Sequence, residues 1–247
     1  DAIIWAVDVV TADVINMSFG GTYDDPAVAA AISYAATSDC VLVAAAGNSN
    51  NSTLNYPAAY GPVIAVAATN PSDRKADYSN YGTWIDVSAP GGESNFSLGT
   101  KYYLNWILST YYTNNNYAWM QGTSMAAPFV SGLAALVIAN NTGITAEGVS
   151  RIIEDYSDDI DAYNPGYEGL LGRGRINALA ALGGMHRRIS HPANGGIVYG
   201  IVPIKGTATG EGFDHYTVEY GIGTSPTSWI TLETGDIPVL QSILATL

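Results

Sequence analysis

A serine in a setting suited to nucleophilic chemistry lies in Gly122-Thr123-Ser124-Met125-Ala126-Ala127-Pro128. Small and aliphatic residues follow as far as Ala139, which predicts a buried helix that begins at this turn, with Pro128 tolerated near its start. The unpaired N–H groups of a helix start favour a developing oxyanion. Ser124 is therefore a candidate nucleophile, provided that a base activates its hydroxyl. The alternative is an ordinary N-cap on a core helix.

Asn48 is a second candidate, because it ends the continuous apolar run Val41-Leu42-Val43-Ala44-Ala45-Ala46-Gly47. Such a run is typical of a strand buried in a parallel sheet. The carboxyl ends of these strands are where α/β sheets carry their chemistry. The Asn48 carboxamide could donate to negative charge that develops on a carbonyl oxygen. The alternative is that Gly47-Asn48 only turns the chain.

The remaining elements alternate between helix and strand, which predicts an α/β fold with a parallel sheet and helices on both faces. The first helix should bury Ile4, Val7 and Ile3, and Asp24-Asp25-Pro26 should start the second. The predicted helices are 1–10, 27–36, 124–139, 145–156 and 177–182. One predicted strand begins at Val14, and three more cover 41–46, 63–68 and 85–88.

Several of these segments, in the same order, resemble the subtilisin-like serine peptidases (subtilases). The resemblance rests on 14–21, 44–48, 56–58, 63–68, 85–91, 122–132 and 172–178, with Phe129 where His is commoner in the family. It implies a subtilisin-like three-layer core, here incomplete, over residues 1–184. It also implies a serine endopeptidase that works through an acyl-enzyme, with a polypeptide as its substrate.

The resemblance assigns roles to particular residues. Ser124 would be the nucleophile, and the Asn48 side chain and the Ser124 N–H would hold the oxyanion. Ser18, Phe19 and Gly20 would pair with the substrate as an added strand. Ala45, Ala46 and Gly47 would be the small apolar walls of the specificity pocket, which favour a medium or large hydrophobic residue before the scissile bond. Asn55 lies near the pocket base, where many relatives have Gly, and could narrow it or favour a polar side chain.

The family's catalytic Asp and His precede its Ser, but His186, His191 and His215 all follow Ser124. We therefore expect a chain that lacks the N-terminal segment with both residues and is inactive alone. One alternative is a pseudo-peptidase that only binds peptides. Another is an α/β-hydrolase-type esterase using Asp155 and His186, disfavoured because Ala126 replaces the last Gly of Gly-x-Ser-x-Gly. Residues 114–117 also do not have the composition of a core strand.

Composition narrows the class further. Hydrophobic residues make up 47% of the chain and charged residues 13%, which indicates a well-packed globular protein. The net charge of −13 argues against nucleic acid and anionic membranes as partners. No apolar run approaches bilayer length, so we expect no membrane anchor. The single Cys40 excludes an internal disulfide and is expected in the core. A secreted or cell-surface protein is the expected context.

A metal is implied only by the resemblance. Subtilases often hold structural calcium through oxygen ligands. In this chain the carbonyls of Ala58, Tyr60 and Val63, with Asp86 nearby, could form a weak site. We assign no metal residues and no other cofactor.

Two regions depart from a compact catalytic domain. The segment 92–107 has more residues than compact subtilases have at this place. The aromatic side chains of this segment and of the residues just after it could contact peptide beside the cleft or pack locally. They are Tyr102, Tyr103, Trp106, Tyr111, Tyr112 and Tyr117. Residues 185–247 form the second expected domain, with a linker at 191–196 and strands at 197–204, 216–220 and 228–232. This pattern resembles a partial β-sandwich of the Ig-like kind that follows many secreted subtilases.

Overall fold

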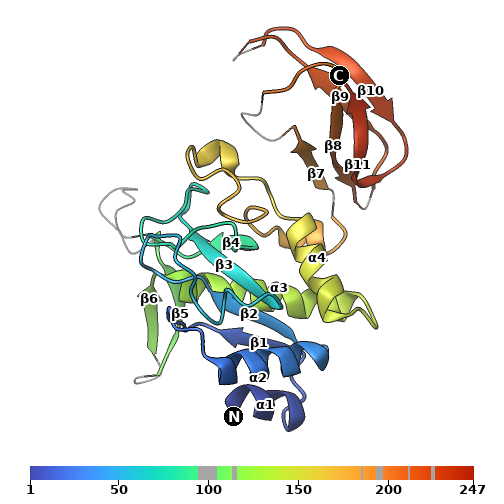
Figure 1. Ribbon diagram of the computed structural model, residues 1–247. Coiled ribbons are helices and arrows are strands. Elements are labelled where there is room, and N and C mark those ends of the chain that lie inside the picture. Colours follow the sequence, from blue (N-terminus) through green and yellow to red (C-terminus); the bar gives the residue numbers. More distant parts are fainter. Residues whose placement is uncertain (94–104, 113–115, 185, 193–196, 211, 224–225) are drawn as a thin grey trace. The chain divides into compact units, whose positions relative to one another are not determined.

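The computed structural model divides into two compact units, Asp1–Asn177 and Ala178–Leu247. It describes residues 1–93, 105–112, 116–184, 186–192, 197–210, 212–223 and 226–247. Each unit has a sheet structure of its own (Figure 1). The predicted boundary after Gly184 lies seven residues beyond the structural division and stays a prediction.

The first unit is built on a four-stranded parallel sheet in the order β1-β2-β3-β4. All residues of β2 and β3 are buried, as expected for continuous apolar strands covered on both faces. The strand predicted at 85–88 begins later, because the Ile85 N–H closes a turn onto the Gly82 carbonyl. The strands are β1 (Val14–Met17), β2 (Val41–Ala45), β3 (Val63–Thr69) and β4 (Val87–Pro90).

Helix α3 (Thr123–Asn140) crosses one face of this sheet and packs against all four strands (Figure 1). Ala126, Ala127 and Ala134 are fully buried, and their small side chains allow close approach to the strands. By length and composition alone, α3 is long and apolar enough to cross a membrane. The expectation that no apolar run approaches bilayer length did not take this helix into account. Its burial against the sheet identifies it as a core helix.

Helices α1 (Ala2–Asp8) and α2 (Pro26–Thr37) lie on the opposite face, where Ile32 and Ala35 share a core cluster with Leu42 and Ala44. Cys40 is buried in the same cluster. The Asp25 side chain caps α2 by accepting from the Ala27 N–H, with Pro26 at the first helical position. The prediction that Ile4 is buried was wrong, since α1 lies on α2 and leaves that side chain 40% exposed.

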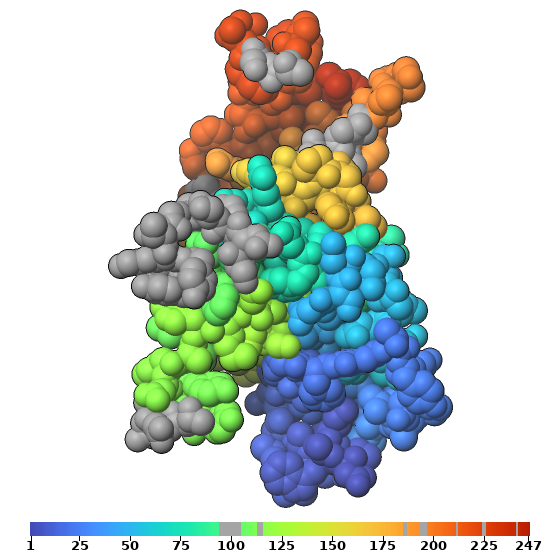
Figure 2. Space-filling model, turned by 90° about the vertical axis from the view of Figure 1, so that its left-hand side faces the viewer, coloured from blue at the N-terminus to red at the C-terminus, as the bar shows by residue number. Residues whose placement is uncertain are grey.

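Helix α4 (Ala146–Asp155) packs on α3 and is capped by the Thr145 hydroxyl, and the 3₁₀ helix η2 covers Asp161–Tyr163. An antiparallel hairpin, β5 (Ile107–Tyr111) and β6 (Asn116–Met120), precedes α3 and projects from the unit (Figure 2). The expectation that 114–117 is not a core strand holds for its two described residues, since Asn116 and Tyr117 belong to an exposed strand of this hairpin. The hairpin is mostly exposed and pairs only with itself, so Ser124 does not follow a strand of the parallel sheet.

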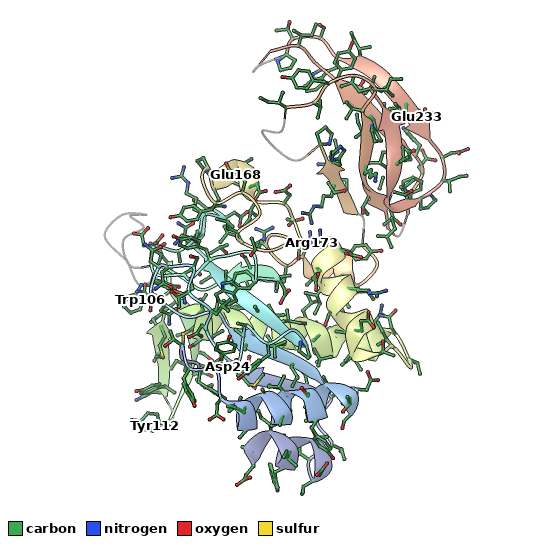
Figure 3. The ribbon with its side chains drawn as sticks, in the orientation of Figure 1. Asp24, Trp106, Tyr112, Glu168, Arg173 and Glu233 are labelled. Atoms are coloured by element: carbon green, nitrogen blue, oxygen red, sulfur yellow. The ribbon has the colours of Figure 1, made fainter. Side chains whose placement is uncertain are left out.

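The aromatic side chains of this region belong partly to the hairpin. Trp106 and Tyr112 lie at opposite ends of β5 (Figure 3), and Tyr112 is 87% exposed. Tyr111 contacts Tyr112, with ring centroids 4.7 Å apart. Tyr102 and Tyr103 lie outside the described residues. The expected contact of this region with peptide therefore stays a prediction.

The second unit is mostly antiparallel β-structure, with the sheet orders β11-β8-β7 and β10-β9 around Ile204, Val218 and Leu244. The strand predicted at 216–220 is β9, whereas the one predicted at 197–204 was wrong for residues 197–201. The apolar residues at 197, 199 and 201 are exposed, and main-chain pairing starts at Val202, which bonds Leu247. His191, expected in a linker, ends β7. The elements are α5 (Ala178–Ala181), β7 (His186–His191), β8 (Pro203–Thr209), β9 (Tyr216–Tyr220), β10 (Ile230–Gly235) and β11 (Val239–Thr246). An Ig-like assignment stays a prediction.

Candidate active site

Ser124 lies in the first turn of α3, directly after a glycine turn. Gly122 has φ +145°, in the region that favours glycine, and its N–H donates to the Gly91 carbonyl at 3.0 Å. Ser124 is half-buried, and its N–H belongs to the first turn, where main-chain N–H groups have no partner within the helix. The turn therefore presents both the hydroxyl and an N–H donor at the protein surface.

Thr123 fixes the orientation of the Asn48 carboxamide. Asn48 Oδ1 accepts from the Thr123 N–H at 2.9 Å and from the Thr123 hydroxyl at 3.0 Å. The same hydroxyl accepts from the Gly47 N–H at 3.1 Å, so the ends of β2 and the start of α3 are joined by three hydrogen bonds. Because both hydrogen bonds from Thr123 end on Oδ1, the other end of the Asn48 carboxamide, the donor Nδ2, faces away from Thr123, and the side chain is exposed.

Ser18 joins the end of β1 to the same turn. The Ser124 hydroxyl donates to the Ser18 carbonyl at 3.1 Å, and the Ser18 hydroxyl donates to the Ser124 carbonyl at 2.9 Å. Asn16 Nδ2 in turn donates to the Ser18 hydroxyl at 2.9 Å. A carbonyl oxygen is no base for the Ser124 proton, and the only histidines of the sequence belong to the second unit. The described contacts of Ser124 thus hold a resting hydroxyl.

Asn55 occupies the space between the two predicted substrate-lining segments. It is 9% exposed, and its Nδ2 donates to the Ala45 carbonyl at 3.4 Å. A Cβ on Gly20 would lie 2.4 Å from Asn55 Nδ2, and one on Gly47 would lie 3.3 Å from its Cγ. Gly20 is therefore needed to make room for the Asn55 side chain, whereas a Cβ on Gly47 would meet Asn80 Nδ2 first, at 2.6 Å.

The other predicted lining residues differ in accessibility. Phe19 is 62% exposed, while Ala45 is 3% and Ala46 0% exposed. The Ala46 N–H and carbonyl are both hydrogen-bonded within the protein, so these two alanines lie beneath the surface of the site. Main-chain hydrogen bonds between Gly21 and Tyr56, at 2.9 and 2.7 Å, hold the segment after Phe19 against the loop at 56–58.

Two positioning side chains were missed by the sequence reading. Thr123 is fully buried and orients Asn48. Asn80 holds the loop that carries Asn48, because its Oδ1 accepts from the Ser49 N–H and its Nδ2 donates to the Ala46 carbonyl, both at 2.9 Å. Thr123 adjoins the candidate nucleophile in sequence, which was an available signal. Asn80 carries no such signal.

The predicted calcium ligands already serve the fold. Asp86 Oδ2 accepts from the Ala65 N–H at 2.7 Å, and burial raises the pKa of this carboxyl to about 6. The Tyr60 carbonyl accepts from the Val63 N–H at 2.9 Å. In the described part of the chain no three His, Cys, Asp or Glu side chains gather in a group that could hold a metal ion. Asp86 is thus held by the fold, and a calcium site at the carbonyls of Ala58, Tyr60 and Val63 stays a prediction.

Comparisons with known proteins identify the family of this chain. The family model described as "Subtilase family" matches residues 1–174. Thermitase of Thermoactinomyces vulgaris is 40% identical over 171 residues, covering 69% of this chain and 54% of the relative. A thermophilic serine proteinase of Bacillus sp. (strain AK1) is 42% identical over 182 residues, covering 74% and 40%. The chain thus spans about half the length of these curated relatives, or less.

Solved structures give the same result for the fold. A protease structure from Pseudoalteromonas arctica superposes with a TM-score of 0.65 at 34% identity, covering 73% of this chain and 56% of that one. The structure of a lanthipeptide protease gives 0.62 at 29% identity, covering 73% and 63%. The family match over residues 1–174, together with the parallel sheet and the helix that carries Ser124 in its first turn, shows that this chain belongs to the subtilase family of serine peptidases.

Proposed function

We propose that this chain supplies the nucleophile, the oxyanion donors and the substrate-binding strand of a serine endopeptidase that cleaves polypeptides. The observation that carries the proposal is the double hydrogen bond from Thr123 to Asn48 Oδ1, which leaves Nδ2 as the outward donor beside the Ser124 turn. A carboxamide held in this way needs no reorganisation when charge develops on a bound carbonyl.

In the proposed reaction Ser124 Oγ attacks the scissile carbonyl carbon and its proton passes to a base. The carbonyl oxygen becomes an oxyanion that accepts from Asn48 Nδ2 and the Ser124 N–H. Collapse of this intermediate transfers the proton from the base to the leaving amine and leaves an acyl-enzyme. Water, deprotonated by the same base, then hydrolyses the acyl-enzyme and restores the Ser124 hydroxyl. The family's base is a histidine oriented by an aspartate, and we assign neither role to a residue of this sequence.

The substrate would lie along Ser18-Phe19-Gly20 as an added antiparallel strand. Asn55 supports a shallow specificity pocket, because its side chain fills the space between Gly20 and Gly47. A hydrophobic residue before the scissile bond remains the proposed preference, with Asn55 limiting its size. A secreted or cell-surface location fits the printed name of one relative, the cell wall-associated protease of Bacillus subtilis, which is 33% identical over 192 residues.

The test supplies a base from a relative. The thermitase segment that precedes its matched region is joined to Asp1, and hydrolysis of a fluorogenic peptide library is measured. We expect cleavage that is abolished by Ser124→Ala. A folded hybrid that binds peptides without cleaving them, while thermitase itself cleaves, would overturn the peptidase proposal in favour of a peptide-binding module.

A further inference from the structure

Lys75 is a buried cation that the proposed chemistry does not use. It is 8% exposed, and its ammonium donates to Asn50 Oδ1 at 2.7 Å, the Ala76 carbonyl at 3.0 Å and the Ser79 carbonyl at 3.1 Å. These three bonds use all three donors of the group. Every acceptor is a neutral oxygen, so within the described residues the charge is held without a carboxylate in direct contact.

Two aromatic rings complete the surroundings of this ammonium. Lys75 Nζ lies 5.1 Å from the Tyr167 ring centroid and 5.5 Å from that of Tyr81, within the range of cation–π attraction. The two rings contact each other edge to face, with centroids 4.9 Å apart. Burial still lowers the pKa of Lys75, while Asp77 and Glu93 act in the opposite direction. The site therefore compensates only part of the desolvation cost with oxygens and rings.

Of the three oxygens bonded to the Lys75 ammonium, the one at the shortest distance is Asn50 Oδ1, which belongs to the loop that carries Asn48. Asn50 has φ +50°, and its N–H donates to the Tyr78 carbonyl at 2.8 Å. Its side chain accepts from Lys75, and the neighbouring Ser49 N–H is held by Asn80. Thr123 holds the Asn48 side chain itself. The oxyanion loop, defined as residues 47–51, is thus fixed at Asn48 by α3 and at Asn50 by Lys75.

A third segment meets the same lysine. The Lys75 N–H donates to Asn164 Oδ1 at 2.7 Å, and Asn164 Nδ2 donates to the carbonyls of Asp73 and Ile160. Tyr167 comes from the same stretch of chain after η2. Lys75 therefore links the oxyanion loop to a segment that lies 89 residues after Lys75 in the sequence.

We propose that Lys75 is a positioning residue for the Asn48 carboxamide: its ammonium acts as a built-in cation that fixes the oxyanion loop through Asn50. The inference rests on the proposed function for its catalytic consequence, but its structural part stands independently. Loss of the charge releases Asn50 Oδ1 and loosens residues 49 and 50 while the sheet stays intact.

The structural part is tested by hydrogen exchange on the full chain. Lys75→Met keeps an unbranched side chain, one atom shorter, and removes the charge, and Lys205→Met, at an exposed lysine, is the matched control. We expect the Ser49 and Asn50 amides to exchange about tenfold faster or more in Lys75→Met, as loss of a charge-assisted hydrogen bond implies, with β3 amides unchanged. Unchanged exchange at residues 49 and 50 in a folded Lys75→Met protein would overturn the proposal.

A second variant keeps the test decisive if Lys75→Met does not fold. Asn50→Gly tolerates the positive φ and removes the acceptor, and Asn50→Asp keeps an acceptor as its control. Faster exchange at Ser49 in Asn50→Gly but not in Asn50→Asp supports the proposal, and equal exchange in both contradicts it. Where both single variants fold, the effects of Lys75→Met and Asn50→Gly should be non-additive, and additive effects would show that the two groups act separately.

The catalytic part is tested in the thermitase hybrid. We expect Lys75→Met to lower kcat about tenfold with little change in KM, as misplacement of a group used in the transition state implies. An inactive parent hybrid would refute the proposed function and leave the exchange result standing. An active parent whose kcat is unaffected by Lys75→Met, despite faster loop exchange, would refute the positioning role alone.

Discussion

Replacement of Thr123 by valine is the perturbation that bears most directly on the geometry around Asn48. The Thr123 hydroxyl donates to Asn48 Oδ1 and accepts from the Gly47 N–H, and Thr123 is fully buried. Valine has nearly the same shape but neither function. The variant loses one net hydrogen bond, about 0.5–1.5 kcal/mol, and leaves the Gly47 N–H without its partner, at about 1–3 kcal/mol.

We therefore expect Thr123→Val to lower the free energy of unfolding by about 2–4 kcal/mol, measured by urea denaturation of the full chain. Thr123→Ser keeps the hydroxyl and should lose less than half as much. Asn48 Oδ1 would keep only the Thr123 N–H, so the carboxamide should also become mobile by NMR. A Thr123→Val protein as stable as the parent, with a rigid Asn48 amide, would refute the assignment of Thr123 as the group that orients Asn48.

Three further predictions concern charge, catalysis and specificity. Burial raises the pKa of Glu154 to about 7; the charge of Asp86 adds to this rise, and that of Arg173, near α4 (Figure 3), opposes it. The folded state therefore binds a proton on Glu154 more tightly than the unfolded state does. The stability from Glu154 is present at low pH and lost as pH rises to about 7; Glu154→Gln should add about 1–3 kcal/mol at pH 8 and almost nothing at pH 4, and an equal gain at both would contradict this. In the thermitase hybrid Asn48→Leu should lower kcat by about 10²–10³, the range known for an oxyanion asparagine of this same family, and a loss confined to KM would contradict the role. Asn55→Gly should deepen the pocket and raise kcat/KM for phenylalanine over alanine before the scissile bond about tenfold, whereas an unchanged ratio would place Asn55 outside the pocket.

The sequence predicted the parallel sheet and its main helices because their signals are local. The continuous apolar runs of β2 and β3, the capping of α2 by Asp25 and the start of α3 at the Gly122 turn each follow from neighbouring residues. The exposed β5–β6 hairpin was missed because its residues carry little apolar alternation. The run at 197–201 alternates without a partner strand, since main-chain pairing begins only at Val202.

The sequence predicted only those residues of the candidate site that belong to a recognisable motif. Ser124 and Asn48 belong to segments that resemble a family, whereas the roles of Thr123, Asn80 and Lys75 depend on which side-chain atoms meet across segments distant in sequence. Such meetings arise from tertiary structure and leave no periodicity in the sequence. The general base is not assigned to any residue, because no histidine of this sequence precedes Ser124.

The central claim is that Asn48 Nδ2 and the Ser124 N–H hold the same carbonyl oxygen. A crystal structure of the thermitase hybrid with a peptide aldehyde tests it most directly. The account predicts a covalent bond from Ser124 Oγ to the aldehyde carbon and an adduct oxygen about 2.7–3.1 Å from both donors. An adduct oxygen directed into solvent, or bonded to groups other than these two, would contradict the account.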